Sequence, residues 1–204
     1  MEKTNALDLS RALIQCSSIT PDDGKAQKLL QKELKNIGFT CHSKTFSEKN
    51  TPDVKNLYAR IGTSTPNFCF AGHTDVVPVG DLKSWNVNPF SGEIVGEKLY
   101  GRGAADMKTA IACFTEASAR FIEKYGANFG GSISLLITGD EEGPAINGTK
   151  KLLNWCHDKG EIFDACLVGE PTNPTILGEM IKIGRRGSLN GTLTVYGVQG
   201  HTAY

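Results

Sequence analysis

Short apolar runs alternate with stretches of helical periodicity along this chain. The runs lie at residues 68–70, 135–137 and 166–168, and apolar positions at helical spacing fill residues 26–37 and 107–122. Apolar runs separated by helical patterns are typical of parallel strands that are covered by helices on both faces. We therefore expect an α/β fold with a mixed, largely parallel sheet flanked by helices.

Capping signals mark the expected beginning and end of an early helix. Thr20 is placed to cap it, Pro21 to occupy its first position and Asp23 to supply the capping-box acid, while Gly38 is a plausible stop. An earlier helix is expected over residues 7–16, where apolar side chains share one face. Two helices should therefore precede the first strand.

The remaining pattern completes the predicted domain. Strand-like stretches cover residues 39–46 and 54–61, and residues 133–137 are apolar throughout, as in a central parallel strand. A helix over about residues 147–156 then returns the chain to a strand at residues 165–168. These elements alternate as an α/β fold requires.

The pattern changes in character after Gly178. Residues 188–196 alternate between apolar and polar side chains, which is typical of a half-buried antiparallel strand. We therefore expect one domain over residues 1–178 and the beginning of a second over residues 179–204.

Composition narrows the classes of function. The chain has 204 residues, and 22 basic side chains balance 22 acidic ones, so nothing favours nucleic acid or an acidic membrane as a partner. No apolar run approaches the ~18 residues of a membrane span, and no secretory leader is evident. The six cysteines form no CxxC pair, so we expect buried free thiols and a soluble, cytoplasmic protein.

Acidic and imidazole side chains follow three of the predicted strands. His73 and Asp75 come after the first, Glu141 and Glu142 after the second, and Glu170 after the third. The carboxyl ends of parallel strands meet at one edge of a sheet, where ligands bind in α/β folds. We therefore expect these side chains to share a crevice.

The residue types favour a hydrolytic metal centre. His73 would be the imidazole ligand, and Asp75, two residues on, can orient its ring. Of the adjacent Glu141 and Glu142, one can bind metal and the other can accept a proton from water. Asp106 would stand at a helix N-terminus, which keeps a carboxylate ionised.

Each residue also has an ordinary structural interpretation. A lone histidine near a strand end is more often structural, adjacent glutamates usually point into solvent, and Glu170 in a turn would normally be exposed. The combination favours the metal interpretation, with zinc as the ion and cobalt or manganese as possible substitutes.

Four motifs together resemble the M20 metallopeptidase family over essentially the whole chain. They are Gly-His-Thr-Asp-Val-Val-Pro at 72–78, Tyr-Gly-Arg-Gly at 100–103 leading to Asp-Met-Lys at 106–108, Gly-Asp-Glu-Glu-Gly at 139–143 and Gly-Glu-Pro-Thr at 169–172. The resemblance implies a zinc aminopeptidase-like catalytic domain over residues 1–178 and a lid or dimerisation domain from residue 179. It also implies a small-molecule substrate, two Zn²⁺ per subunit with Co²⁺ as a possible substitute, and a homodimer.

The resemblance also implies a role for each site residue. One zinc would be held by His73, Asp106 and Glu170, and the other by the bridging Asp106 with Glu142. Glu141 would be the general base, with Asp75 acting behind His73. The peptide bond between Asp106 and Met107 would be cis.

Two further segments resemble one branch of the family. Residues 184–188 and 199–201 are similar to members that hydrolyse N-succinyl-LL-2,6-diaminopimelate to succinate and LL-2,6-diaminopimelate in lysine biosynthesis. This likeness implies that Arg185 and Ser188 contact the substrate. It also implies that His201 stabilises the oxyanion in the active site of a dimer partner.

The sequence departs from the family pattern in one respect. The family completes its second zinc site with a histidine from a later part of the catalytic domain, and this sequence stops before it. We therefore expect residues 1–204 alone to bind at most one metal tightly and to be poorly active. We also expect them to lack part of the surface on which the family dimerises.

Two alternatives stay open, and a third has little support. The chain could be another M20 amidohydrolase, such as an acetylornithine deacetylase or a dipeptidase, or an inactive truncated remnant that binds metal. A nucleotide-binding module has little support, because Gly101 and Gly103 are not followed by the third glycine of the dinucleotide fingerprint.

Overall fold

A computed structural model describes residues 4–184, 187, 189 and 191–203. The chain divides into two compact units, Met1–Pro171 and Thr172–Tyr204. Every helix and strand formed by the described residues lies in the first unit. None of these helices is long and apolar enough to cross a membrane.

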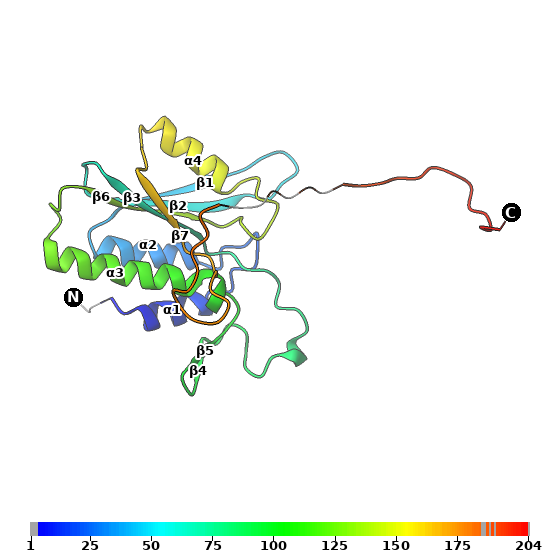
Figure 1. Cartoon of the computed structure of the whole chain (residues 1–204), viewed down its shortest axis with the longest axis horizontal. Coiled ribbons are helices and arrows are strands. Elements are labelled where there is room, and N and C mark those ends of the chain that lie inside the picture. Colours follow the sequence, from blue (N-terminus) through cyan, green and yellow to red (C-terminus); the bar gives the residue numbers. More distant parts are fainter. Residues whose placement is uncertain (1–3, 185–186, 188, 190, 204) are drawn as a thin grey trace. The chain divides into compact units, whose positions relative to one another are not determined.

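A five-stranded mixed sheet forms the centre of the first unit (Figure 1). The two pairings made by β3 are parallel, and the two made by β2 are antiparallel. In spatial order the strands are β1 (Thr40–Phe46), β2 (Val54–Ile61), β6 (Ser132–Thr138), β3 (Asn67–His73) and β7 (Ala165–Val168). The prediction of a mixed sheet flanked by helices is confirmed.

Helices cover both faces of this sheet. In Figure 1, α1 (Ala6–Gln15), α2 (Ala26–Asn36) and α3 (Thr109–Tyr125) lie on one face and α4 (Thr149–Asp158) on the other. A small hairpin, β4 (Glu93–Val95) with β5 (Lys98–Tyr100), and two short helical turns, η1 (Leu82–Ser84) and η2 (Ala104–Lys108), complete the first unit.

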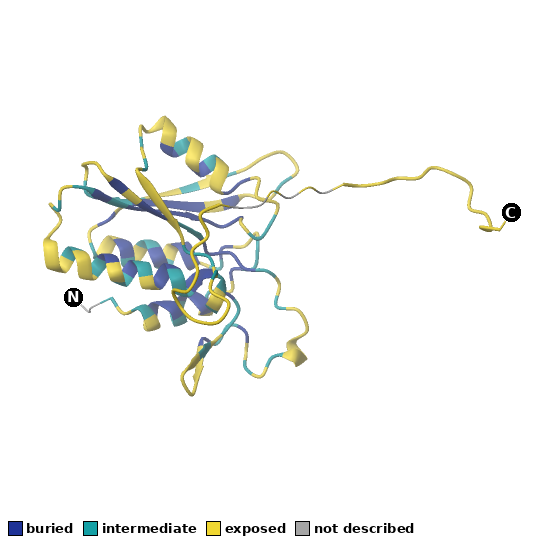
Figure 2. Cartoon of the chain, viewed as in Figure 1, coloured by how far each residue is buried: buried dark blue, intermediate teal, exposed yellow. Residues whose placement is uncertain are grey.

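The core occupies both faces of the sheet, as the buried stretches of the central strands show (Figure 2). Leu135 and Ile137 of β6 join the larger cluster with α1, α2 and α3. Leu136, between them in sequence, joins the smaller cluster with Leu152 of α4. Because both faces of β6 are covered, the strand is apolar at consecutive positions rather than at alternate ones.

The second helix begins later than the capping signals predict. Its first residue is Ala26 rather than Pro21. The backbone of Ile19 forms a bridge with Val76, and the Thr20 N–H donates to the Val76 carbonyl oxygen at 3.0 Å. The Asp22 N–H donates to the Ile19 carbonyl oxygen at 2.8 Å, so Thr20 and Pro21 lie in a turn rather than at the start of a helix.

The described residues of the predicted strand at 188–196 lie outside any strand. Within this stretch Leu193 is 90% exposed. A half-buried strand needs a neighbouring strand to satisfy its backbone groups, and the described residues of the second unit form none. The prediction of a second domain from residue 179 stays a prediction.

All six cysteines are free, as predicted, but not all are buried. Cys69 and Cys156 are buried, whereas Cys113 and Cys166 are exposed. Cys166 lies on β7, at the edge of the sheet, and Cys113 lies on an exposed part of α3. The prediction of buried thiols is therefore wrong for these two.

Leu30 provides a test of the larger cluster, because its side chain is buried between α2 and the sheet. The substitution Leu30→Ala should lower the free energy of unfolding by ~2–5 kcal/mol through the loss of buried surface and the cavity left behind. Urea denaturation measures the change. Leu82→Ala is the control, since Leu82 is 64% exposed; equal effects of the two substitutions would contradict this packing.

Candidate metal centre

His73 is the last residue of β3 and is only 1% exposed. Its Nδ1 lies 2.9 Å from the main-chain carbonyl oxygen of Asp75. A carbonyl oxygen can only accept, so Nδ1 carries a proton and donates it there, and Nε2 is the nitrogen that a metal ion would bind. The strand and this hydrogen bond therefore fix the direction in which Nε2 points.

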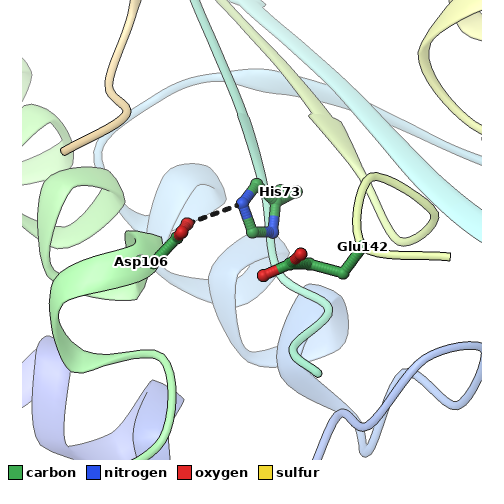
Figure 3. A group of neighbouring side chains, drawn as sticks. All are labelled: His73, Asp106 and Glu142. Atoms are coloured by element: carbon green, nitrogen blue, oxygen red, sulfur yellow. Dashed lines mark hydrogen bonds and ion pairs between the residues drawn. The ribbon is translucent and has the colours of Figure 1, made fainter. Parts of the chain in front are cut away.

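Asp106 approaches this nitrogen from η2. Its Oδ1 lies 3.0 Å from His73 Nε2 (Figure 3). The peptide bond between Asp106 and Met107 is cis, as the family resemblance implies. Met107 lies beneath the strand end: its Sδ accepts the His73 N–H at 3.3 Å, and a Cβ on Gly72 would overlap its Cε. Gly72 therefore permits the close approach of η2 to β3.

Three glutamates complete the cluster. Glu170, after β7, places Oε1 3.3 Å from His73 Nε2, and Glu141 places Oε2 at 3.9 Å. Glu142 groups with His73 and Asp106, with one ligand atom from each residue within 4.8 Å of the others. The carboxylates of Asp106 and Glu142 both point toward the imidazole (Figure 3). The structure thus brings together every predicted metal ligand.

Asp75 connects the strand end to the loop that follows β6. Its Oδ2 accepts the N–H groups of Glu141 and Glu142 at 3.1 and 3.0 Å. Its Oδ1 lies 3.5 Å from His73 Nδ1, farther away than its own main-chain carbonyl oxygen. The carboxylate therefore holds the glutamate loop more closely than it holds the imidazole.

Burial and repulsion between neighbouring carboxylates both disfavour negative charge at the centre. Burial lowers the pKa of His73, but hydrogen bonds to Asp75 and Glu170 outweigh it and raise the pKa to about 11. The pKa values of Asp106, Glu141 and Glu142 are raised, first by burial and then by neighbouring carboxylates. A divalent cation would relieve this repulsion, and one imidazole with several carboxylates suits zinc. The donor set therefore fits a metal ion.

The structure does not test the roles predicted for the substrate and oxyanion residues. Arg185 and Ser188 lie outside the described residues. His201 belongs to the second unit, is exposed, and accepts the Ala203 N–H on Nδ1 at 3.1 Å. The roles of these three residues stay predictions.

Sequence patterns did not identify Lys108 and Asp140, which are buried beside the centre. Lys108 Nζ donates to the carbonyl oxygen of Cys16 at 2.8 Å, just beyond the end of α1, and burial lowers its pKa to about 8. Both residues lie inside the family motifs, next to residues with expected roles. This position in the motifs is the only sequence feature that could have pointed to them.

Comparison with known proteins identifies similar sequences. The profile of Peptidase family M20/M25/M40 matches residues 69–201. A succinyl-diaminopimelate desuccinylase of Methylorubrum populi is 59% identical over 204 residues, which are 100% of this chain and 53% of that protein. One of Rhodospirillum centenum is 61% identical over 196 residues, 96% of this chain and 50% of that protein. The chain thus spans about half the length of the curated relatives it matches.

Solved structures share the fold at low sequence identity. The M20 metallo-carboxypeptidase Sso-CP2 from Sulfolobus solfataricus has a TM-score of 0.68 and 21% identity, covering 81% of this chain and 37% of that one. Human carnosine dipeptidase 1 has a TM-score of 0.66 and 21% identity, covering 80% and 37%. These likenesses concern the fold alone.

Substitution of His73 tests the centre directly. His73→Ala should weaken Zn²⁺ binding by at least about 10-fold. Loss of a residue that only hydrogen-bonds a metal ligand lowers the affinity by about that much, and loss of the ligand itself should cost no less. Isothermal titration calorimetry measures the affinity. The exposed His157 provides the matched control, His157→Ala; a similar loss of affinity there, or none in His73→Ala, would rule out this centre.

Proposed function

The chain belongs to peptidase family M20/M25/M40, and from this premise we propose that its carboxylate-lined centre serves in the hydrolysis of N-succinyl-LL-2,6-diaminopimelate. The products are succinate and LL-2,6-diaminopimelate. The substrate is supported by the names of relatives 59% and 61% identical to this chain. The observation that carries the proposal is the convergence of four acidic side chains on the buried imidazole of His73.

We assign the metal ligands from the same cluster. His73, Asp106 and Glu170 would hold one Zn²⁺, and Asp106 with Glu142 would contribute to holding a second, with Co²⁺ as a possible substitute. Such an ion supplies Lewis acidity: it polarises a carbonyl group and lowers the pKa of water. The raised carboxyl pKa values support this assignment, because a cation would offset the burial and the repulsion that cause them.

Glu141 is the proposed general base. Its side chain is about half exposed, so it borders the centre and also reaches solvent. In the reaction, Glu141 takes a proton from the attacking water as the water oxygen bonds to the succinyl carbonyl carbon. The C–N bond then breaks, and the same proton passes to the departing amine of diaminopimelate. The proton taken from water is the one that the amine receives, so the reaction needs no other proton donor.

The remaining assignments rest on sequence motifs. Arg185 and Ser188 would contact the substrate, whose carboxylates suit pairing with arginine. His201 would stabilise the oxyanion in the active site of a partner subunit, and residues 179–204 would begin the lid domain of a cytoplasmic homodimer.

An assay of acyl preference tests the substrate. The Zn²⁺-loaded gene product should release succinate from N-succinyl-LL-2,6-diaminopimelate with a higher kcat/KM than it shows for acetate release from N-acetyl-L-ornithine. Direct competition of the two substrates measures the ratio. Preference for the acetylated substrate would refute the desuccinylase assignment, and hydrolysis of neither would refute the proposed reaction.

Substitution of Glu141 separates catalysis from metal binding. Glu141→Gln should lower kcat by roughly 10²–10⁴-fold, the usual contribution of a positioned general base, while Zn²⁺ affinity stays nearly unchanged. Steady-state kinetics and calorimetry provide the two values. Glu97→Gln, in the exposed turn of the β4–β5 hairpin, is the control; a fully active Glu141→Gln enzyme would exclude Glu141 as the base.

A further inference from the structure

Asp140 is a buried acid next in sequence to Glu141, and its carboxylate oxygens bind backbone N–H groups. It follows β6 and is 3% exposed. Its Oδ1 accepts the N–H of Ala145 at 3.1 Å, and its Oδ2 accepts the N–H of Asn147 at 2.9 Å. Both oxygens therefore bind the loop that presents Glu141 and Glu142.

The loop is folded tightly around this carboxylate. Ala145 has a φ of 57°, in the left-handed region that side chains disfavour. A Cβ on Gly143 would lie 2.6 Å from Asp140 Oδ1 and 2.6 Å from Thr20 Oγ1, and one on Gly148 would lie 2.9 Å from the Asp140 carbonyl oxygen. The glycines of this segment are therefore required by the closeness of Asp140.

Two carboxylates accept hydrogen bonds from the backbone N–H groups of the loop. Asp75 accepts the N–H groups of Glu141 and Glu142, and Asp140 accepts two that follow. Asn147 also ties the loop to the segment before β2, because its Nδ2 donates to the Pro52 carbonyl oxygen at 2.7 Å. Hydrogen bonds from amides to a carboxylate are stronger than those between neutral groups, so the loop is held at both ends.

We infer that Asp140 is a positioning residue, which fixes loop 141–147 so that Glu142 faces the metal centre and Glu141 faces the substrate. The assignment of those two roles rests on the proposed function. Adjacent glutamates repel each other and would otherwise turn toward solvent. Because both carboxylate oxygens of Asp140 are engaged with the loop backbone, its loss should lower metal affinity and kcat and leave KM unchanged.

The test is Asp140→Asn, which keeps the shape but sets an NH₂ group against one of the two N–H donors. Zn²⁺ affinity and kcat should each fall by about 10–100-fold, as for other residues that support ligands. The visible absorption of bound Co²⁺ should change as well. Asp81→Asn is the matched control, because exposed Asp81 also accepts a turn N–H, that of Lys83 at 3.0 Å. It should alter none of these values.

Amide hydrogen exchange provides a second measurement that needs no activity and no substitution. In the unsubstituted protein, the Ala145 and Asn147 amides should exchange slowly although they lie in a loop, and Asp140→Asn should lose this protection while β6 keeps its own. Fast exchange in the unsubstituted protein, or unchanged Co²⁺ absorption and Zn²⁺ affinity in a folded Asp140→Asn protein, would overturn the inference. Absence of hydrolysis by the unsubstituted full-length protein would instead refute the proposed function, and the exchange result would stand.

Discussion

The centre depends on holding several carboxylates around one buried imidazole against their mutual repulsion. The acids come from three parts of the fold: Asp106 from η2, Glu141 and Glu142 from the loop after β6, and Glu170 from the residues after β7. Parallel pairing of β6 and β7 with β3 brings the ends of three strands to one edge of the sheet. The packing of the sheet therefore opposes the repulsion, which is why a buried apolar core and a polar centre occur together.

The sequence predicted this arrangement well where the signal was local. Each predicted strand overlaps an observed one in the first unit, and His73, Glu142 and Glu170 meet because they follow strands that are parallel neighbours. The cis bond at Asp106 came from the family resemblance and was confirmed. Periodicity and the expectation of parallel strands were sufficient for the strands and for the meeting of these side chains.

Contacts distant in sequence were not predictable in the same way. Thr20 and Pro21 resemble a helix start, yet pairing of the preceding residue with Val76 places them in a turn. Sequence patterns assigned Asp140 no role, and its burial depends on how the loop turns back onto it. Such positions are decided by a partner that a local pattern cannot reveal.

The bonds from the Asp75 carboxylate to the loop after β6 have a consequence for how this site can change. They make the end of β3 and the glutamate loop one mechanical unit, although more than sixty residues separate them along the chain. Substitutions in the two segments should therefore be non-additive, as is usual for residues in one hydrogen-bonded network. A replacement tolerated on one side constrains which replacements the other side accepts, so the two motifs must evolve as a pair.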